Sequence, residues 1–67
     1  METIKLKYYG GIGYDSFSEI GIYEVRGNET KQFQRLSKAK QYYENLDEEK
    51  SIWNIEGCPE LIECHTL

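Results

Sequence analysis

The stretch that decides the fold runs from residue 33 to residue 46 and reads FQRLSKAKQYYENL. Its apolar side chains recur every three or four residues, with polar and charged residues between them: Phe33, Leu36, Ala39, Tyr42 or Tyr43, and Leu46. This spacing predicts an amphipathic helix. A helix of about three turns is only marginally stable alone in water, so the rest of the chain must supply a surface that buries the apolar stripe.

The start of this helix can be interpreted in two ways. We favour a helix over residues 38–46 with Ser37 as its N-cap, because the serine hydroxyl can accept a free backbone N–H. A capping box is missing, since Lys40 stands where Glu or Gln would be needed. In the competing interpretation, Asn28 caps a helix over residues 29–50, and residues 29–35 are then helical rather than extended.

The N-terminal segment alternates polar and apolar residues over 3–8, which is typical of a strand. We expect Ile4, Leu6 and Tyr8 to face inward and Lys5 and Lys7 to face water. Glycines then interrupt the pattern at positions 10, 11 and 13 and predict a turn or loop.

Residues 18–26 resume strand character, but the alternation slips between Ile22 and Tyr23. A bulge near Gly21, or a strand buried on both faces, would explain the slip. Residues 26–29 form a turn, and residues 30–33 can pair back as a third strand in a hairpin. Gly27-Asn28 is a recognised signal for a two-residue hairpin loop.

After the helix, residues 51–55 are typical of a strand with Trp53 and Ile55 on one side. A turn follows at residues 57–59, because proline cannot donate to a sheet ladder. Residues 60–67 are either a last strand with Ile62, Cys64 and Thr66 on one face or a frayed tail.

These segments together predict a single small domain over residues 1–67 of the α+β class. We expect an antiparallel sheet of three to five strands with one amphipathic helix packed on one face, in the order ββ(β)αβ(β). A chain of 67 residues is close to the smallest size at which one hydrophobic core suffices.

Charge and cysteine content narrow the function classes. The net charge of −4 disfavours nonspecific attraction to nucleic acid and to anionic membranes. Without an apolar leader or spanning segment in the sequence, we expect a cytoplasmic protein with reduced cysteines and no membrane partner. The size and composition are typical of a small bacterial or phage accessory protein.

Catalytic and metal chemistry have little support. The soft metal ligands are Cys58, Cys64 and His65. Three ligands do not close a structural zinc site, and neighbouring residues of a strand point to opposite faces. The same geometry prevents Cys64 from using His65 as a base. We therefore expect no metal, no cofactor and no enzymatic activity.

The main functional expectation is a protein-interaction module whose partner is another protein or a second copy of the chain. Its predicted contacts are the aromatic residues beside the glycines, Tyr8, Tyr9, Tyr14 and Phe17, together with an exposed sheet edge.

Two alternatives follow from the charge distribution. Residues 47–67 are strongly acidic, and Glu48, Glu49, Glu56 and Glu60 could occupy the basic site of a nucleic-acid-binding protein. Weak nucleic-acid binding could instead use the basic residues Lys5, Lys7, Lys31, Arg35 and Lys38.

Overall fold

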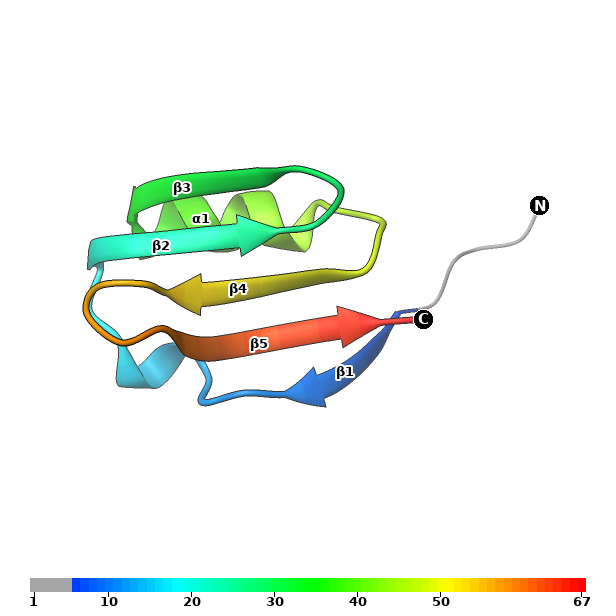
Figure 1. The fold of residues 1–67 in the computed structure, drawn as a ribbon, viewed down its shortest axis with the longest axis horizontal. Helices are drawn as coiled ribbons and strands as arrows, with labels where there is room; N and C mark the ends of the chain where they lie inside the picture. The colour runs from blue at the N-terminus through cyan, green and yellow to red at the C-terminus, as the bar shows by residue number, and fades with distance from the viewer. Residues whose placement is uncertain (1–5) are drawn as a thin grey trace.

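The computed structural model describes residues 6–67, and Figure 1 shows how the elements are arranged. Within this range the strands and helices are β1 (Lys7–Gly10), the 3-10 helix η1 (Tyr14–Ser16), β2 (Ile20–Arg26), β3 (Thr30–Arg35), α1 (Leu36–Glu44), β4 (Lys50–Asn54) and β5 (Glu60–Thr66).

The strands form one antiparallel sheet in the order β1-β5-β4-β2-β3. The helix α1 packs on one face of this sheet, against β2, β3 and β4 (Figure 1). The predicted α+β class and the order ββ(β)αβ(β) are confirmed. Among residues 6–67, neither helix has the length and apolar character of a membrane-spanning segment.

The core lies between α1 and the sheet. Its buried residues are Tyr23, Val25, Leu36, Ala39, Tyr43, Ile52 and Ile62. The predicted apolar stripe is therefore used by the domain's own sheet: Leu36, Ala39 and Tyr43 are buried, and Phe33, Tyr42 and Leu46 pack around them.

The first turn of α1 is capped by a residue that lies far from it in the sequence. The helix begins at Leu36 rather than Lys38, and Arg35 is its N-cap without a side-chain capping bond. The backbone N–H of Ser37 donates to Oε1 of Glu19 at 3.2 Å, and the Ser37 hydroxyl donates to Oε2 at 2.5 Å. The prediction that Ser37 caps the helix is wrong, because the fold supplies Glu19 as the acceptor for the free N–H groups.

β2 carries the predicted bulge. Its pairing with β3 shifts between Ile20 and Tyr23, where Gly21 and Ile22 together oppose Gln34. A Cβ atom on Gly21 would lie 3.1 Å from the Tyr23 ring, so glycine lets the tyrosine fold over the strand. Ile22 remains 41% exposed.

The β2–β3 hairpin has a longer loop than predicted. Arg26 pairs with Thr30, which leaves Gly27, Asn28 and Glu29 in the loop, one residue more than the two expected. The Gly27 N–H donates to the Glu29 carbonyl at 3.0 Å. Because β3 is a strand, the competing helix over residues 29–50 is wrong.

β1 is an edge strand, and within residues 6–67 it runs from Lys7 to Gly10. Leu6 is half-buried. Tyr8 points to the helix side of the sheet, as predicted, with its ring against His65, but it is 54% exposed rather than buried. The reason is that β1 lies beyond the part of the sheet that α1 covers. Ile4 and Lys5 lie outside the described residues.

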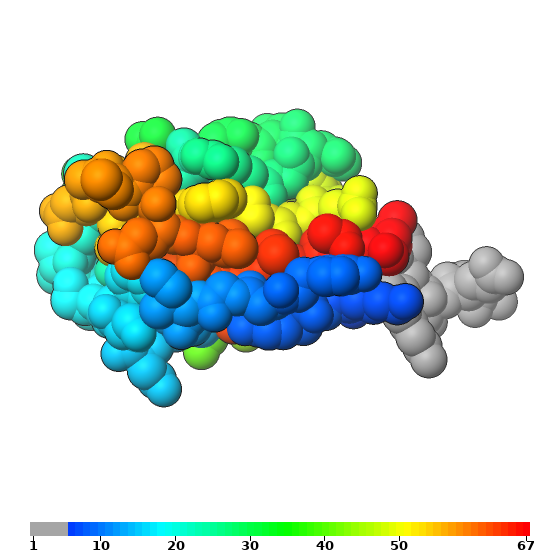
Figure 2. Space-filling model, turned by 60° about the horizontal axis from the view of Figure 1, so that its bottom comes forward, coloured from blue at the N-terminus to red at the C-terminus, as the bar shows by residue number. Residues whose placement is uncertain are grey.

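The glycine-rich loop continues along β5 instead of leaving the sheet. The N–H groups of Ile12 and Gly13 donate to the carbonyls of Leu61 and Ile62 at 3.0 Å and 2.9 Å. Gly11 has a φ of +135°, and a Cβ there would lie 2.1 Å from the Ile62 carbonyl oxygen. Figure 2 shows this side of the molecule, with β1 lying along β5.

Residues 60–66 form a full strand rather than a frayed tail. Between the partners of Ile52 and Trp53, β5 carries one additional residue, Ile62. This irregularity puts Ile62 in the core, whereas Cys64 and Thr66 line a hollow on the other face. The prediction that Ile62 shares a face with Cys64 and Thr66 is therefore wrong.

Candidate interaction surface

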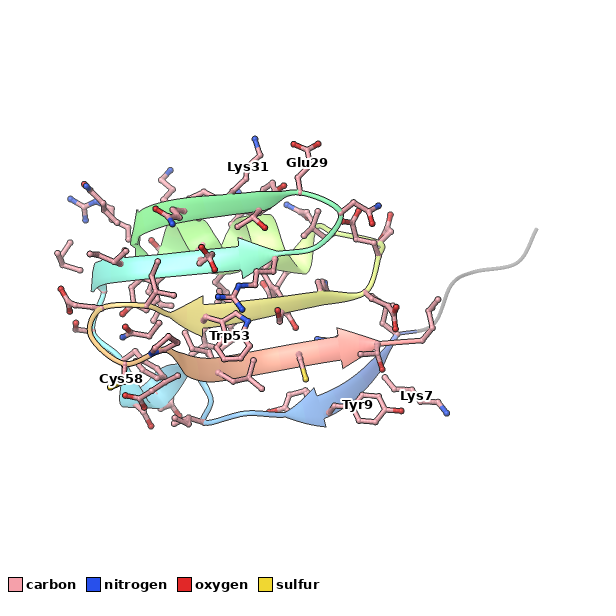
Figure 3. All side chains as sticks on the ribbon, viewed as in Figure 1. Lys7, Tyr9, Glu29, Lys31, Trp53 and Cys58 are labelled. Atoms are coloured by element: carbon pink, nitrogen blue, oxygen red, sulfur yellow. The ribbon has the colours of Figure 1, made fainter. Side chains whose placement is uncertain are left out.

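No helix of residues 6–67 covers the face of the sheet opposite α1, which we call the open face (Figure 3). Cross-strand pairs define it, because directly opposed residues share a face: Glu24 opposes both Gln32 and Trp53, and Arg26 opposes Ser51. The open-face residues are Lys7, Tyr9, Ile22, Glu24, Arg26, Thr30, Gln32, Gln34, Ser51, Trp53, Leu61, Cys64 and Thr66.

Trp53 occupies the middle of the open face (Figure 3). The guanidinium carbon of Arg26 lies 4.7 Å from the centre of its ring, which is a cation–π contact. The indole N–H donates to the hydroxyl of Ser51 at 2.8 Å, and Leu61 lies opposite Trp53 on β5. Contacts on several sides therefore hold the indole in a fixed orientation.

Glu24 connects Arg26 to the neighbouring strand. Its Oε2 accepts a hydrogen bond from Nε of Arg26 at 2.5 Å, and its Oε1 accepts one from the Gln32 side chain at 3.1 Å. These bonds, first from Arg26 and then from Gln32, lower the pKa of Glu24. A row of ordered side chains thus crosses the open face from β3 through β2 to β4.

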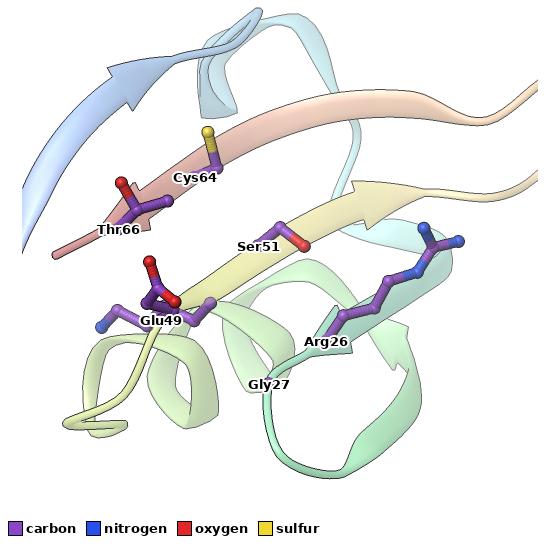
Figure 4. A pocket seen from close by; sticks show the side chains of 7 residues that line it. Arg26, Gly27, Glu49, Ser51, Cys64 and Thr66 are labelled. Atoms are coloured by element: carbon purple, nitrogen blue, oxygen red, sulfur yellow. The ribbon is translucent and has the colours of Figure 1, made fainter.

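Two shallow hollows lie beside this row of side chains. One, of about 430 Å³, is lined by Ile22, Gln32, Phe33 and Gln34. The other, of about 290 Å³, is shown in Figure 4 and is lined by Arg26, Gly27, Glu49, Lys50, Ser51, Cys64 and Thr66. Open hollows of this kind suit a partner that lies across the sheet better than an enclosed substrate.

The titratable groups on the helix side of the sheet have structural roles in and around the core. The hydroxyl of Tyr43 lies 2.5 Å from Nδ1 of His65. The ammonium of Lys50 donates to the carbonyls of Tyr43, in the last turn of α1, and of Leu46, just beyond the helix, at 2.7 Å and 3.1 Å. Burial raises the pKa of Tyr43 and lowers the pKa of Lys50.

Tyr14 belongs to the same side of the sheet. Its hydroxyl is buried and has no hydrogen-bond partner among residues 6–67. Burial, and then the charges of Glu63 and Glu44, raises the pKa of Tyr14. The ammonium of Lys40 lies 4.8 Å from the centre of the Tyr14 ring. This arrangement anchors the loop after β1 to α1.

The predicted aromatic contacts do not form one surface. Tyr8 and Tyr9 are 54% and 61% exposed, but as neighbours in β1 they point to opposite faces. Tyr14 and Phe17 pack against the core, and Phe17 meets Tyr23 edge-on at 6.4 Å. Of the four, Tyr9 alone lies on the open face.

The predicted acidic contacts are divided between the two ends of β4: Glu48 and Glu49 precede it, and Glu56 and Glu60 follow it. Glu48 accepts a hydrogen bond from the Asn28 N–H, and Glu49 accepts one from the Leu67 N–H at 3.2 Å. At least two of the four thus hold loops together.

The predicted basic residues are also separated. Lys7 lies on β1 and Lys31 and Arg35 lie on β3, which form opposite edges of the sheet. Lys38 lies on α1, and Lys5 is outside the described residues.

The cysteines and the histidine do not converge. Cys58 is exposed in the turn before β5, Cys64 lies on the open face, and His65 contacts Tyr43 on the helix side. Residues 6–67 contain no cluster of three or more histidine, cysteine, aspartate or glutamate side chains that could hold a metal ion.

Sequence reasoning missed Trp53 and Arg26 as candidate contacts. Trp53 was expected to share a strand face with Ile55, but β4 ends at Asn54. The available signal was Ile52, whose neighbour in a strand must face the other way. A tryptophan beside a deeply buried isoleucine is therefore a candidate for the uncovered face.

No protein-family model, curated protein or solved structure matches this chain.

Proposed function

We propose that this chain is a non-enzymatic protein-interaction module that binds a partner protein through its open face. The observation that supports this function is Trp53, which lies under Arg26 in the middle of a sheet face without a helix. Tryptophan and arginine are the residue types that most often dominate the binding energy of protein interfaces.

The surface is ordered before any partner arrives. Arg26 is held by Glu24, and the Trp53 indole is held by Ser51. Side chains that are already fixed lose less conformational entropy on binding, so more of the contact energy appears as affinity.

The free groups of this surface indicate the chemistry of the partner. Among residues 6–67, no hydrogen bond engages the two terminal nitrogens of Arg26, whose side chain is 44% exposed. They can donate to a carboxylate or carbonyl group. Trp53 and Leu61 offer apolar area next to them. The partner we propose places an apolar side chain on Trp53 and an acidic side chain beside Arg26.

A protein partner suits this surface better than nucleic acid. The chain carries a net charge of −4, and the carboxylate of Glu24 is part of the open face. A nucleic-acid site would need several unpaired basic side chains on one face, but the basic residues lie on opposite edges of the sheet.

Affinity capture from the cells that make this protein tests the proposal. Bait variants Trp53→Ala and Arg26→Ala remove the two central contacts, and Lys38→Ala, on the exposed side of α1, is the matched control. We expect one or more proteins to be retained equally by the original chain and Lys38→Ala. Recovery should fall at least tenfold with either open-face variant.

Circular dichroism of each bait separates lost contact from lost folding. Equal recovery of the same proteins by the original chain and both folded open-face variants would overturn the proposal.

A further inference from the structure

The edge of the sheet at β3 presents backbone groups that no strand of residues 6–67 pairs with. β3 pairs with β2 on one side, and every second residue of such an edge strand points its N–H and C=O outward. Figure 3 shows Glu29 and Lys31 extending beyond this edge. Lys31, Gln32, Gln34 and Arg35 are all exposed.

The opposite edge is less suited to pairing. β1 has four residues and its register is irregular between Tyr8 and Gly10. Gly10 and Gly11 then adopt positive φ values, which bend the strand away from a regular ladder. β3 is longer, with six residues, and the additional residue of its irregular pairing lies on β2 rather than on the edge strand itself.

Pairing of β3 with the β3 of a second copy allows few registers. Antiparallel copies of one strand are related by a two-fold axis perpendicular to the sheet, and opposed residues must share a face. The axis must therefore pass through a residue pair such as Lys31–Lys31, Gln32–Gln32 or Phe33–Phe33.

Charge selects one of these registers. An axis at Lys31 opposes two lysines, and an axis at Phe33 opposes Lys31 to Arg35 twice. Both place like charges directly opposite each other, which is destabilising. An axis at Gln32 opposes Glu29 to Arg35 twice and Lys31 to Phe33 twice, so every charged contact is attractive or neutral.

We propose that two copies of this chain associate through antiparallel pairing of their β3 strands, centred on Gln32, with Glu29 of each copy opposite Arg35 of the other. The two sheets become one continuous sheet with both α1 helices on the same side. The Phe33–Tyr42 ring pair, 5.5 Å between centroids and half-buried at this edge, gains cover from the second copy. This inference concerns a different surface from the open face and does not depend on the proposed function.

Charge reversal tests the pairing. Sedimentation velocity of the full chain over a concentration series should give a dimer of about twice 7.9 kDa that dissociates on dilution. Glu29→Arg and Arg35→Glu should each raise the dissociation constant at least tenfold, and the double variant should restore it. Lys7→Glu reverses a charge on β1, at the opposite edge of the sheet, and should leave the dimer unchanged. A monomer at every concentration, or a double variant no better than the single ones, would overturn the proposal.

Cysteine cross-linking tests the register. In a chain with Cys58→Ser and Cys64→Ser, Gln32→Cys places two thiols across the two-fold axis, where opposed Cα atoms are about 4.5–5.5 Å apart and can form a disulfide. Gln34→Cys is the control, since it opposes Thr30. We expect rapid covalent dimers with Gln32→Cys only. Equal cross-linking from both positions would contradict the register centred on Gln32.

Discussion

The guanidinium of Arg26 lies 4.7 Å from the centre of the Trp53 ring and thereby joins β2 to β4 on the face that α1 leaves uncovered. Trp53 is the only tryptophan of the chain, so tryptophan fluorescence reports on the surroundings of this one side chain. We predict that Arg26→Ala shifts the emission to longer wavelength and increases quenching by acrylamide, because the indole gains contact with water. The free energy of unfolding should fall by about 0.5–1 kcal/mol. Lys38→Ala should change neither quantity, and an unchanged emission in Arg26→Ala would contradict the stacked arrangement.

Glu19 is predicted to be the residue on which the first turn of α1 depends. Its carboxylate accepts hydrogen bonds from both the backbone and the hydroxyl of Ser37. Glu19→Ala should lower the free energy of unfolding in urea by about 1 kcal/mol, as loss of a helix cap does. Glu60→Ala, at an exposed glutamate whose side chain makes no hydrogen bond within residues 6–67, should have almost no effect. Equal stability of the two variants would show that Glu19 does not cap the helix.

Gly11 is predicted to be the least replaceable residue of the glycine-rich loop. A Cβ there would collide with the Ile62 carbonyl in addition to straining the backbone, and neither backbone can move without separating the loop from β5. Gly11→Ala should cost about 2–4 kcal/mol. Gly13→Ala, with a φ of +92° and no atom within 4 Å, should cost only the backbone strain of about 1–2 kcal/mol. Urea unfolding measures both, and similar losses would show that the close approach to Ile62 is unimportant.

Stability is predicted to decline in alkali as Tyr14 and Tyr43 ionise. Burial raises both pKa values in the folded state above the ordinary value of about 10. The folded state therefore holds these protons more tightly than the unfolded chain. Their contribution is complete below about pH 10 and is lost as the pH rises through the raised folded-state values. Circular dichroism and tyrosinate absorbance should change together in this range.

Tyr14→Phe provides the matched variant for this titration. It removes one ionising group together with a buried hydroxyl that has no partner among residues 6–67. We expect an alkaline midpoint at higher pH and a gain of about 1 kcal/mol in the free energy of unfolding at neutral pH. Tyr9→Phe, on an exposed residue, should leave both unchanged. A loss of stability in Tyr14→Phe would indicate that the hydroxyl has a bonding role.

The sequence predicts local features of this fold well and distant ones poorly. The α1 stripe through Leu36, Ala39 and Tyr43 is visible because helical neighbours lie three or four residues apart. The bulge at Gly21 is visible because one residue too many breaks the alternation. The capping of Ser37 by a glutamate eighteen positions earlier has no local signal.

The candidate surface could not be predicted from the sequence for a related reason. Trp53 and Arg26 come together only when β4 pairs with β2, and the chain between them contains β3 and α1. The additional residue at Ile62 also reverses the face of Cys64, and it depends on how β5 aligns with β4. Strand order and register decide which side chains meet on the open face, and a single sequence specifies neither.

Site-specific photo-cross-linking in the producing cell tests the central claim most directly. A benzophenone side chain replaces either Ile22, which is 41% exposed on the open face, or Lys38, which is exposed on α1. The proposed function predicts a covalent adduct with a different protein from position 22 and none from position 38. Dimers of the chain itself are recognised by mass and excluded. An adduct with another protein from position 38 alone, or none from position 22, would contradict the account.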